Sequence, residues 1–168
     1  MKLTDYLAIY GALLSSVVFL WTAARARPKI KVRLILAIEG EDDKLEHGVG
    51  ISIQNPSSHT AHISNVSLLY PLRKPTVRER LKYLVKNKSL PLNIGWCHGS
   101  LSVYGLDDKC PASIEPGKSH WIFVPDVKLR EVLSGALAPR LKAVAQDALW
   151  RNKYSPSFTY DVPALPEA

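Results

Sequence analysis

Residues with the chemistry to bind zinc are spread over the second half of the sequence. Cys97, His98, Cys110 and His120 supply four side chains that can ligate a metal ion. Their spacing fits no compact Cys/His template, and adjacent Cys and His side chains cannot readily meet on one tetrahedral ion. We therefore expect no metal and no cofactor. In the cytoplasm the two thiols are expected to stay reduced.

Signatures of catalysis are missing from the sequence. A nucleophilic serine or cysteine needs a base and an orienting group beside it, yet the chain has no Gly-x-Ser-x-Gly elbow and no glycine-rich phosphate loop. The acidic runs at residues 41–43 and 107–108 lack EF-hand spacing. We expect a protein that is not an enzyme, although a triad assembled in space from distant residues would escape this argument.

Positive charge is concentrated in two stretches. Residues 25–33 carry five basic groups and no acid, and residues 73–88 carry seven basic groups and one acid. The formal net charge of the whole chain is only +7, so the remaining residues are net acidic. The candidate residues facing a membrane or a partner are Arg25, Arg27, Lys29, Arg73, Lys74, Arg78, Arg80, Lys82, Lys86 and Lys88.

The second basic stretch has the pattern of an amphipathic helix. Thr76-x-x-Glu79 matches a capping box, and apolar residues from Val77 to Val85 recur at helical spacing. We expect a helix over residues 76–88, inserted between strands. The interpretation we favour is that its apolar stripe covers one edge of the domain and its lysines are solvated. The alternative is that it lies on anionic lipid headgroups. Nucleic acid is not expected, because no nucleic-acid motif accompanies the basic residues.

Two tryptophans are candidates for different roles. Trp96 lies in a glycine-containing stretch, Asn93 to Gly99, that is typical of a loop. An exposed aromatic side chain there would be an anchor for a partner, and the alternative is that the loop folds over the edge of the domain. Trp121 lies in an apolar run and is expected in the core.

An apolar N-terminal segment indicates a membrane. The 19 residues from Tyr6 to Ala24 carry no charge and would form a helix of about 28 Å, close to the roughly 30 Å hydrocarbon core. The strong positive charge follows the segment, whereas a signal peptide has it before. The positive-inside rule therefore predicts an uncleaved anchor with the N-terminus outside and the C-terminal domain in the cytoplasm. The alternative is an envelope-side domain behind a cleaved or uncleaved signal, in which Cys97 and Cys110 would pair.

Short strands are expected in most of the remaining chain. Residues 30–38 and 49–53 alternate with period two, and a slip of the apolar phase within residues 61–70 indicates a bulge. Further strands are expected at 101–104, 120–124, 141–145 and 154–160, with a short helix at 127–137. About seven short strands with turns between them favour an antiparallel sandwich.

Three segments resemble small single-pass membrane proteins of bacteria and phages. They are ISIQNPSSHTAHISNVSLLYP, IEPGKSHWIFVPDVKLREVL and LKAVAQDALWRNKYSPSF. The first resembles their strand, turn and strand, the second their L-x-P-G-x-S turn with a strand and short helix, and the third their closing hairpin. Residues 148–150 lack the glycine that this hairpin turn carries. The resemblance implies an immunoglobulin-like β-sandwich and no activity. We expect a single-pass protein of the bacterial inner membrane.

Together these patterns predict a mainly all-β chain in three parts. Residues 1–27 form the transmembrane anchor and its basic flank, residues 28–161 the antiparallel immunoglobulin-like β-sandwich with the inserted helix at 76–88, and residues 162–168 a tail. We expect a non-catalytic interaction or scaffold module. Its partners would be the lipid bilayer, through anionic headgroups, and a protein that the sequence does not identify. The alternative function is phage exclusion or defence, as an accessory protein that perturbs a membrane.

Overall fold

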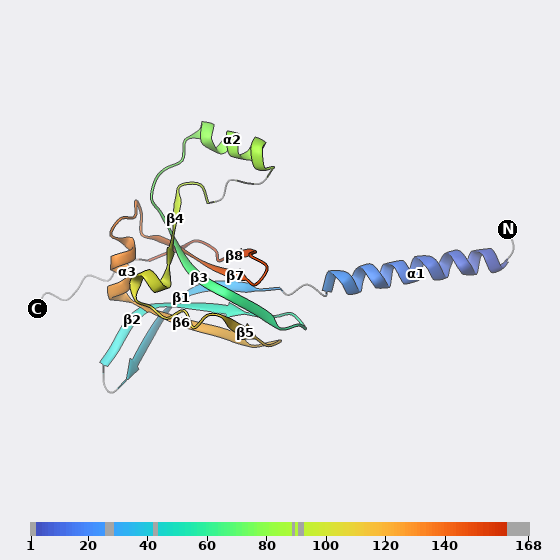
Figure 1. Ribbon diagram of the computed structural model, residues 1–168, viewed down its shortest axis with the longest axis horizontal. Coiled ribbons are helices and arrows are strands. Elements are labelled where there is room, and N and C mark those ends of the chain that lie inside the picture. The colour runs from blue at the N-terminus through green and yellow to red at the C-terminus, as the bar shows by residue number, and fades with distance from the viewer. Residues whose placement is uncertain (1–2, 26–28, 42–43, 89, 91–92, 161–168) are drawn as a thin grey trace, which may run out of the picture.

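The computed structural model describes residues 3–25, 29–41, 44–88, 90 and 93–160, and it shows a long N-terminal helix followed by a β-rich domain (Figure 1). Helix α1 (Leu3–Arg25) is exposed over residues 4–22. Two of its hydroxyl groups bond back into the helix, Ser16 Oγ to the Ala12 carbonyl and Thr22 Oγ1 to the Val18 carbonyl, both at 2.8 Å, so these two groups can lie in an apolar medium. Residues Thr4–Thr22 are long and apolar enough to cross a membrane, a criterion that a signal sequence also meets.

The described residues form nine strands in two antiparallel sheets, so the predicted mainly β, antiparallel architecture is confirmed. The first sheet has the order β1-β2-β6, from β1 (Lys31–Glu41), β2 (Lys44–Gln54) and β6 (Ser119–Pro125). The second has the order β4-β3-β7-β8, with β5 beside β3 and β9 beside β7. Its strands are β3 (Ala61–Pro71), β4 (Trp96–Ser100), β5 (Ala112–Ile114), β7 (Arg140–Asp147), β8 (Asn152–Tyr154) and β9 (Phe158–Thr159). The connections contain α2 (Val77–Asn87), the single-turn helix η1 (Leu101–Tyr104) and α3 (Asp126–Leu133).

One core holds the two sheets together. Alternate apolar residues are buried in the first part of β1, at Val32 and Leu34, and in β2, at Val49, Ile51 and Ile53, and α3 adds two more buried side chains. Leu36 and Ile38 continue the period-two pattern of β1 but are exposed. The members that are 1% exposed or less are Val49, Ile51, Ile53, Ala61, Ile63, Val66, Leu68, Leu101, Val124, Leu129, Val132, Leu141, Ala143 and Ala145.

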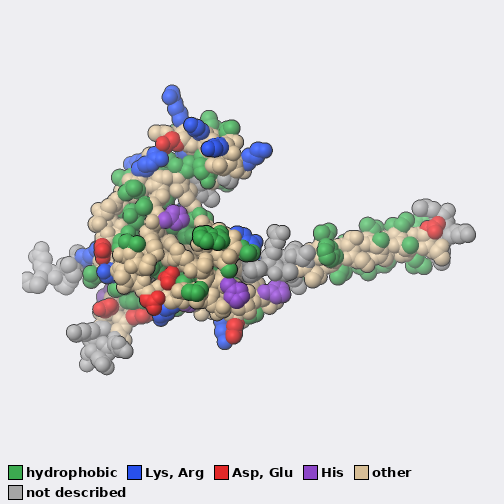
Figure 2. All heavy atoms as spheres, viewed as in Figure 1, with side chains coloured by type: hydrophobic (Ala, Val, Ile, Leu, Met, Phe, Trp, Pro, Cys, Tyr) green, Lys and Arg blue, Asp and Glu red, His purple; other side chains and the backbone are tan. Residues whose placement is uncertain are grey.

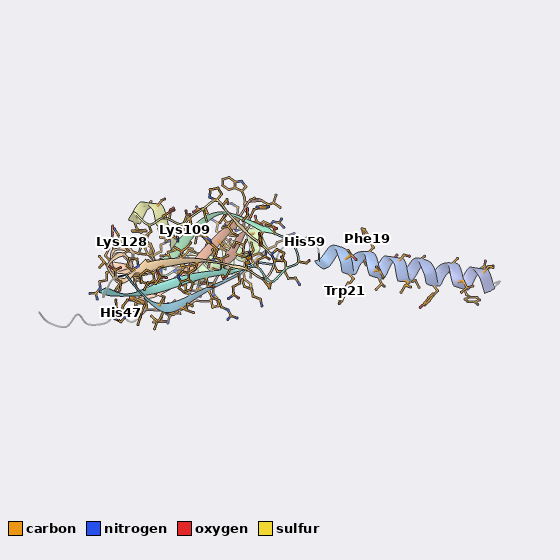
Figure 3. The ribbon with its side chains drawn as sticks, turned by 90° about the horizontal axis from the view of Figure 1, so that it is seen from below. Phe19, Trp21, His47, His59, Lys109 and Lys128 are labelled. Carbon is orange, nitrogen blue, oxygen red and sulfur yellow. The ribbon has the colours of Figure 1, made fainter. Side chains whose placement is uncertain are left out.

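The strand registers define two ends of the domain. At the first end β1 begins, with Lys31 opposite Gln54, and the turn at residues 55–60 leads into β3. At the second end lie the tip of the β1–β2 hairpin, the end of β3 at Pro71 and the start of α3. Figure 3 shows His59 at the end nearer α1, and His47 and Lys128 at the opposite end. The chain therefore enters the domain at one end and leaves for α2 at the other.

A buried amide secures the first end. Asn55 is 1% exposed, and its Nδ2 donates hydrogen bonds to the carbonyl oxygens of His59 (2.8 Å) and Ile114 (2.7 Å). Its Oδ1 accepts the Ser57 amide at 3.1 Å. The side chain thus joins the 55–60 turn to the strand that follows the cis Cys110-Pro111 peptide.

Trp121 is not in the core, contrary to expectation. Ile122 and Val124 of β6 point inward, so Trp121 lies on the outer face of the first sheet and is 37% exposed. Its ring covers Gly50 of β2, where an added Cβ would lie 1.9 Å from a ring carbon. Its Nε1 donates to the Glu39 carboxylate. The glycine is needed because the indole occupies the space that a side chain would fill.

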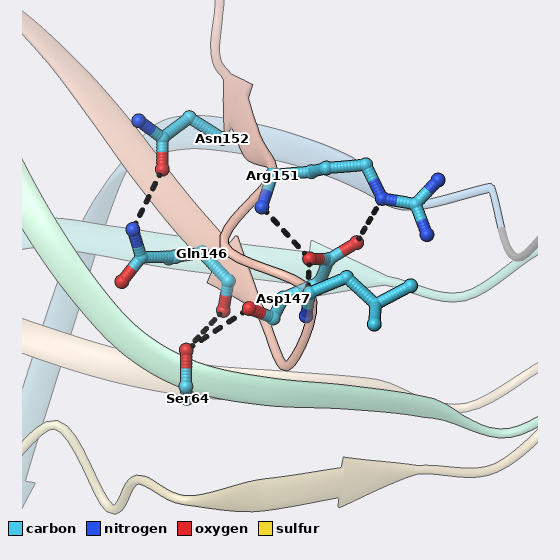
Figure 4. Close-up of polar contacts among 6 residues, drawn as sticks. Ser64, Gln146, Asp147, Arg151 and Asn152 are labelled. Carbon is cyan, nitrogen blue, oxygen red and sulfur yellow. Dashed lines mark hydrogen bonds and ion pairs between the residues drawn. The ribbon is translucent and has the colours of Figure 1, made fainter.

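The closing β7–β8 turn contains no glycine. Trp150 takes the left-handed conformation there, with φ of 61°. Asp147 organises the loop: its Oδ1 accepts the amides of Leu149 and Arg151, both at 2.9 Å, and its Oδ2 pairs with Arg151 Nε at 3.3 Å (Figure 4). Ser64 Oγ of β3 donates to the Asp147 carbonyl at 3.2 Å and fixes the turn to the sheet. These bonds stabilise the turn in a backbone conformation that a glycine would adopt more readily.

Several element predictions need correction. The predicted bulge is present, as a register shift between Ile63 and Asn65. Residues 101–104 form η1 rather than a strand, and the strand lies just before them at 96–100. The expected last strand is divided into β8 and β9, and the predicted tail at 162–168 lies outside the described residues.

Candidate interaction surface

Helix α2 begins at the capping box that the sequence predicts. Thr76 Oγ1 accepts the Glu79 amide at 3.3 Å, and Glu79 Oε2 accepts the Thr76 amide at 3.0 Å. Arg73 Nη1 also lies 2.8 Å from Glu79 Oε1, and this guanidinium, with the Thr76 amide, lowers the pKa of the Glu79 carboxyl. The helix ends at Lys88, whose left-handed backbone (φ 49°) directs its amide to the Leu84 carbonyl. Local interactions alone therefore define both ends of α2.

The helix is carried on a closed neck between β3 and β4. The amides of Leu72 and Arg73 both donate to the Gly95 carbonyl, at 2.9 and 3.1 Å. Gly95 has φ of +82°, and an added Cβ would lie 2.3 Å from the Arg73 carbonyl oxygen. Because the neck closes where the two strands end, α2 is held away from the sheets (Figure 1).

The apolar stripe of α2, formed by Val77, Leu81, Leu84 and Val85, is exposed to solvent. The exposed fractions are 81%, 62%, 40% and 73%, and no residue of α2 is buried. We favoured a stripe that covers one edge of the domain, and this interpretation is wrong. The neck holds the helix apart from the sheets, so its stripe does not pack on the core that it was expected to cover.

Basic residues border the stripe on both sides. At 100° per residue, Arg78 lies beside Val85 on one side of the stripe and Arg80 beside Leu84 on the other. Both arginines are exposed, as is Lys74 just before the helix. Figure 2 shows basic and hydrophobic side chains gathered over α2, at the top of the molecule. The surface therefore combines exposed apolar area with a cationic border.

The two lysines of α2 lie on the side of the helix opposite its apolar stripe. Lys82 and Lys86 line a cavity of about 320 Å³ together with Tyr83, and Arg73 and Glu79 close one side of it. The cavity lies between the helix and the returning chain at Ile94. Because Arg73 is paired with Glu79 there, the uncompensated charge of this face comes from the lysines.

The first basic stretch is not brought together with the second. Arg25 is the last residue of α1, Lys29 is exposed just before β1, and Arg27 lies outside the described residues. Arg25 and Lys29 precede β1 at the first end of the domain, whereas α2 is attached at the second end. The two basic regions are thus separated by the length of the sheets.

Trp96 is part of a strand and is covered. It opens β4 opposite Pro71, and it is half-buried. Lys142 of β7 places its Nζ 4.5 Å from the centre of the indole ring and donates to Asn93 Oδ1 at 3.1 Å. Burial lowers the pKa of Lys142. The ring is therefore engaged by its own chain at the base of the neck, and the loop expected at this position is a strand.

The cysteines and histidines do not converge on a metal site. Cys97 lies opposite Tyr70 on β4, and Cys110 lies in the loop before β5; both are free thiols. Burial and the neighbouring Asp108 carboxylate raise the pKa of Cys110 to about 12, which keeps it protonated and unreactive. His120 Nε2 bonds to the Asp108 carbonyl at 3.0 Å. Among the described residues there is no group of three or more metal-binding side chains.

One surface was missed by the sequence analysis. The β1–β2 hairpin runs beyond its last pairing with β6, at Gly48 opposite Pro125. Ile38 and Leu45 lie beyond this pairing and are 59% and 73% exposed, and Leu36, opposite Val49, is also 71% exposed. The only sequence signal was acidic: Glu39 and Glu46 face each other across the ribbon, an unfavourable pair in a compact sheet.

Searches with the whole chain against protein-family models, curated proteins and solved structures find no match in any of the three.

Proposed function

We propose that this chain is a membrane-anchored, non-catalytic interaction module. In this proposal α1 is the tether and α2, on its neck, is the contact surface. The observation that carries the proposal is the exposed apolar stripe of α2, which has arginines on both borders and no role in the core. A helix whose apolar face is left in water gains free energy when a partner covers that face.

The proposal also covers the orientation and the sheet architecture. We propose that the basic residues following α1 keep the β-domain on the cytoplasmic side of a bacterial inner membrane. We further propose that the two sheets form an immunoglobulin-like sandwich, an assignment supported by the antiparallel pairing and the shared core. Sandwich domains commonly present loops and edges to partners, although fold alone does not establish function.

The neck provides a direct test. Residues 73–94 can be replaced by a two-residue Asn-Gly turn, because Leu72 and Gly95 are already hydrogen-bonded neighbours. We expect this deletion variant to fold and to lose the proteins or lipids that co-purify with the full chain from membranes. An exposed substitution elsewhere, Val127→Ser, serves as the control and should lose nothing. Identical co-purifying material in the deletion variant and the full chain would contradict the assignment of α2.

The orientation has a separate test. We expect a reporter that works only in the cytoplasm to be active when it is fused to the C-terminus. The mass of the fusion protein should include α1. A periplasmic reporter would overturn the orientation, and a mass without the first 26 residues would show that α1 is a cleaved signal.

A further inference from the structure

We propose that α2 is a second membrane contact, which docks on the anionic surface of the same bilayer that holds α1. The inference rests on the proposed function, because it names the partner of the α2 surface. Two-point attachment would change the domain from a body on a single tether to one lying along the membrane.

The side-chain arrangement of α2 matches a charged lipid surface. The stripe of Val77, Leu81, Leu84 and Val85 is narrow and exposed, and it has the composition of a helix that lies in the interfacial plane. Arg78 and Arg80 stand at its two borders, where long cationic side chains can reach phosphate groups while the stripe enters the acyl boundary. The one acid of the helix, Glu79, is already neutralised by Arg73. Among the described residues of α2, nothing opposes an anionic surface.

The topology specifies the docked pose. The tether enters at the start of β1, and α2 hangs from the end of β3, an 11-residue strand that spans about 36 Å. Both ends can touch one bilayer only if the strands run roughly parallel to its plane. The neck at Leu72 and Gly95 leaves α2 outside the sheets, so docking does not require the core to open.

Energetics favour two contacts acting together. A basic residue near an anionic surface contributes about 1 kcal/mol, roughly fivefold in affinity. The stripe is a small apolar area, and such a helix alone would bind weakly. On a tethered domain, however, the second binding event is intramolecular, and its effective concentration is set by the tether. A weak helix is therefore sufficient.

The test uses the full chain in single-copy nanodiscs of phosphatidylcholine, with or without phosphatidylglycerol. An environment-sensitive fluorophore is attached at Val85→Cys in a Cys97→Ser, Cys110→Ala background. We expect a blue shift of emission in the anionic discs only. The control position is Val127→Cys, which is 75% exposed where Val85 is 73% exposed, and it should not shift. Hydrogen exchange of residues 77–87 in the unsubstituted chain, slowed only in anionic discs, checks the result without the substitutions.

Charge variants separate the lipid from other occupants. Arg78→Gln with Arg80→Gln should lower the equilibrium constant for docking about 25-fold, whereas Arg140→Gln with Lys153→Gln removes the same charge elsewhere and should change it little. No shift in anionic discs, or an equal shift in neutral discs, would overturn the proposal. A shift that needs two copies per disc would identify a second chain as the occupant and would overturn it as well. In either case a protein that co-purifies with the full chain but not with the deletion variant would leave the proposed function standing.

Discussion

The clearest quantitative prediction compares two helical leucines. Leu81 in α2 is 62% exposed and Leu129 in α3 is fully buried. Leu129→Ala should lower the free energy of unfolding by about 2–5 kcal/mol, because it removes a buried side chain and leaves a cavity. In Leu81→Ala little more than a third of the side chain is covered, no cavity forms, and alanine is a better helix former. We therefore expect a change of about 0.5 kcal/mol.

The assay is urea or thermal unfolding of the full chain in detergent, followed by tryptophan fluorescence. For a domain of this size each kcal/mol corresponds to roughly 3 °C in Tm, so Leu129→Ala should lose about 6–15 °C and Leu81→Ala less than about 2 °C. Both leucines lie inside helices, so the intrinsic helix preference is matched and the difference reports burial. If Leu81→Ala lost as much stability as Leu129→Ala, the stripe of α2 would be packed on the domain and its assignment as a contact surface would be refuted.

Three further results are expected. Asn55→Asp should destabilise the domain by about 3 kcal/mol in urea unfolding, because a carboxylate cannot donate to the two carbonyls that the amide serves; an unchanged midpoint would contradict the clamp. Gly50→Ala should cost about 1–3 kcal/mol by collision with the indole, and Trp121→Ala in the same chain should recover part of that loss in a double-mutant comparison. The thiol of Cys110, with its pKa raised to about 12, should be alkylated at pH 8.5 at least about 100-fold more slowly in the folded chain than in urea. Since the unfolded thiol ionises near its ordinary pKa and the folded one does not, stability should also fall as the pH rises above about 9.

Local patterns in the sequence were sufficient for most elements. The alternation in β1 and β2, the slip at Ile63 and the capping box at Thr76 each report a short-range interaction that the structure retains. The mainly antiparallel β architecture follows from those patterns. Positions that depend on distant residues were not accessible in the same way. Trp121 is outside the core because its neighbours Ile122 and Val124 point inward, and periodicity alone does not state which phase is buried in an apolar run.

The candidate surface likewise has features that local sequence predicts and features that depend on distant residues. Amphipathicity identified α2 and its basic residues, but an apolar stripe looks identical in sequence whether it covers a sheet or faces solvent. The stripe is exposed because the neck joins Leu72 to Gly95, which are 23 positions apart in the sequence. Only the pairing of β3 with β4 shows that these two residues are neighbours. Trp96 was misplaced for a related reason: the lysine that covers it belongs to β7, far along the chain.

Site-specific photo-crosslinking in intact membranes tests the central claim most directly. A photoreactive residue is placed at position 85 on the stripe and, as the matched control, at position 127 on α3, since both valines are about equally exposed. We predict lipid or protein adducts at position 85 and none above background at position 127. Equal labelling at the two positions, or none at position 85, would contradict the account of α2 as the contact surface of a tethered module.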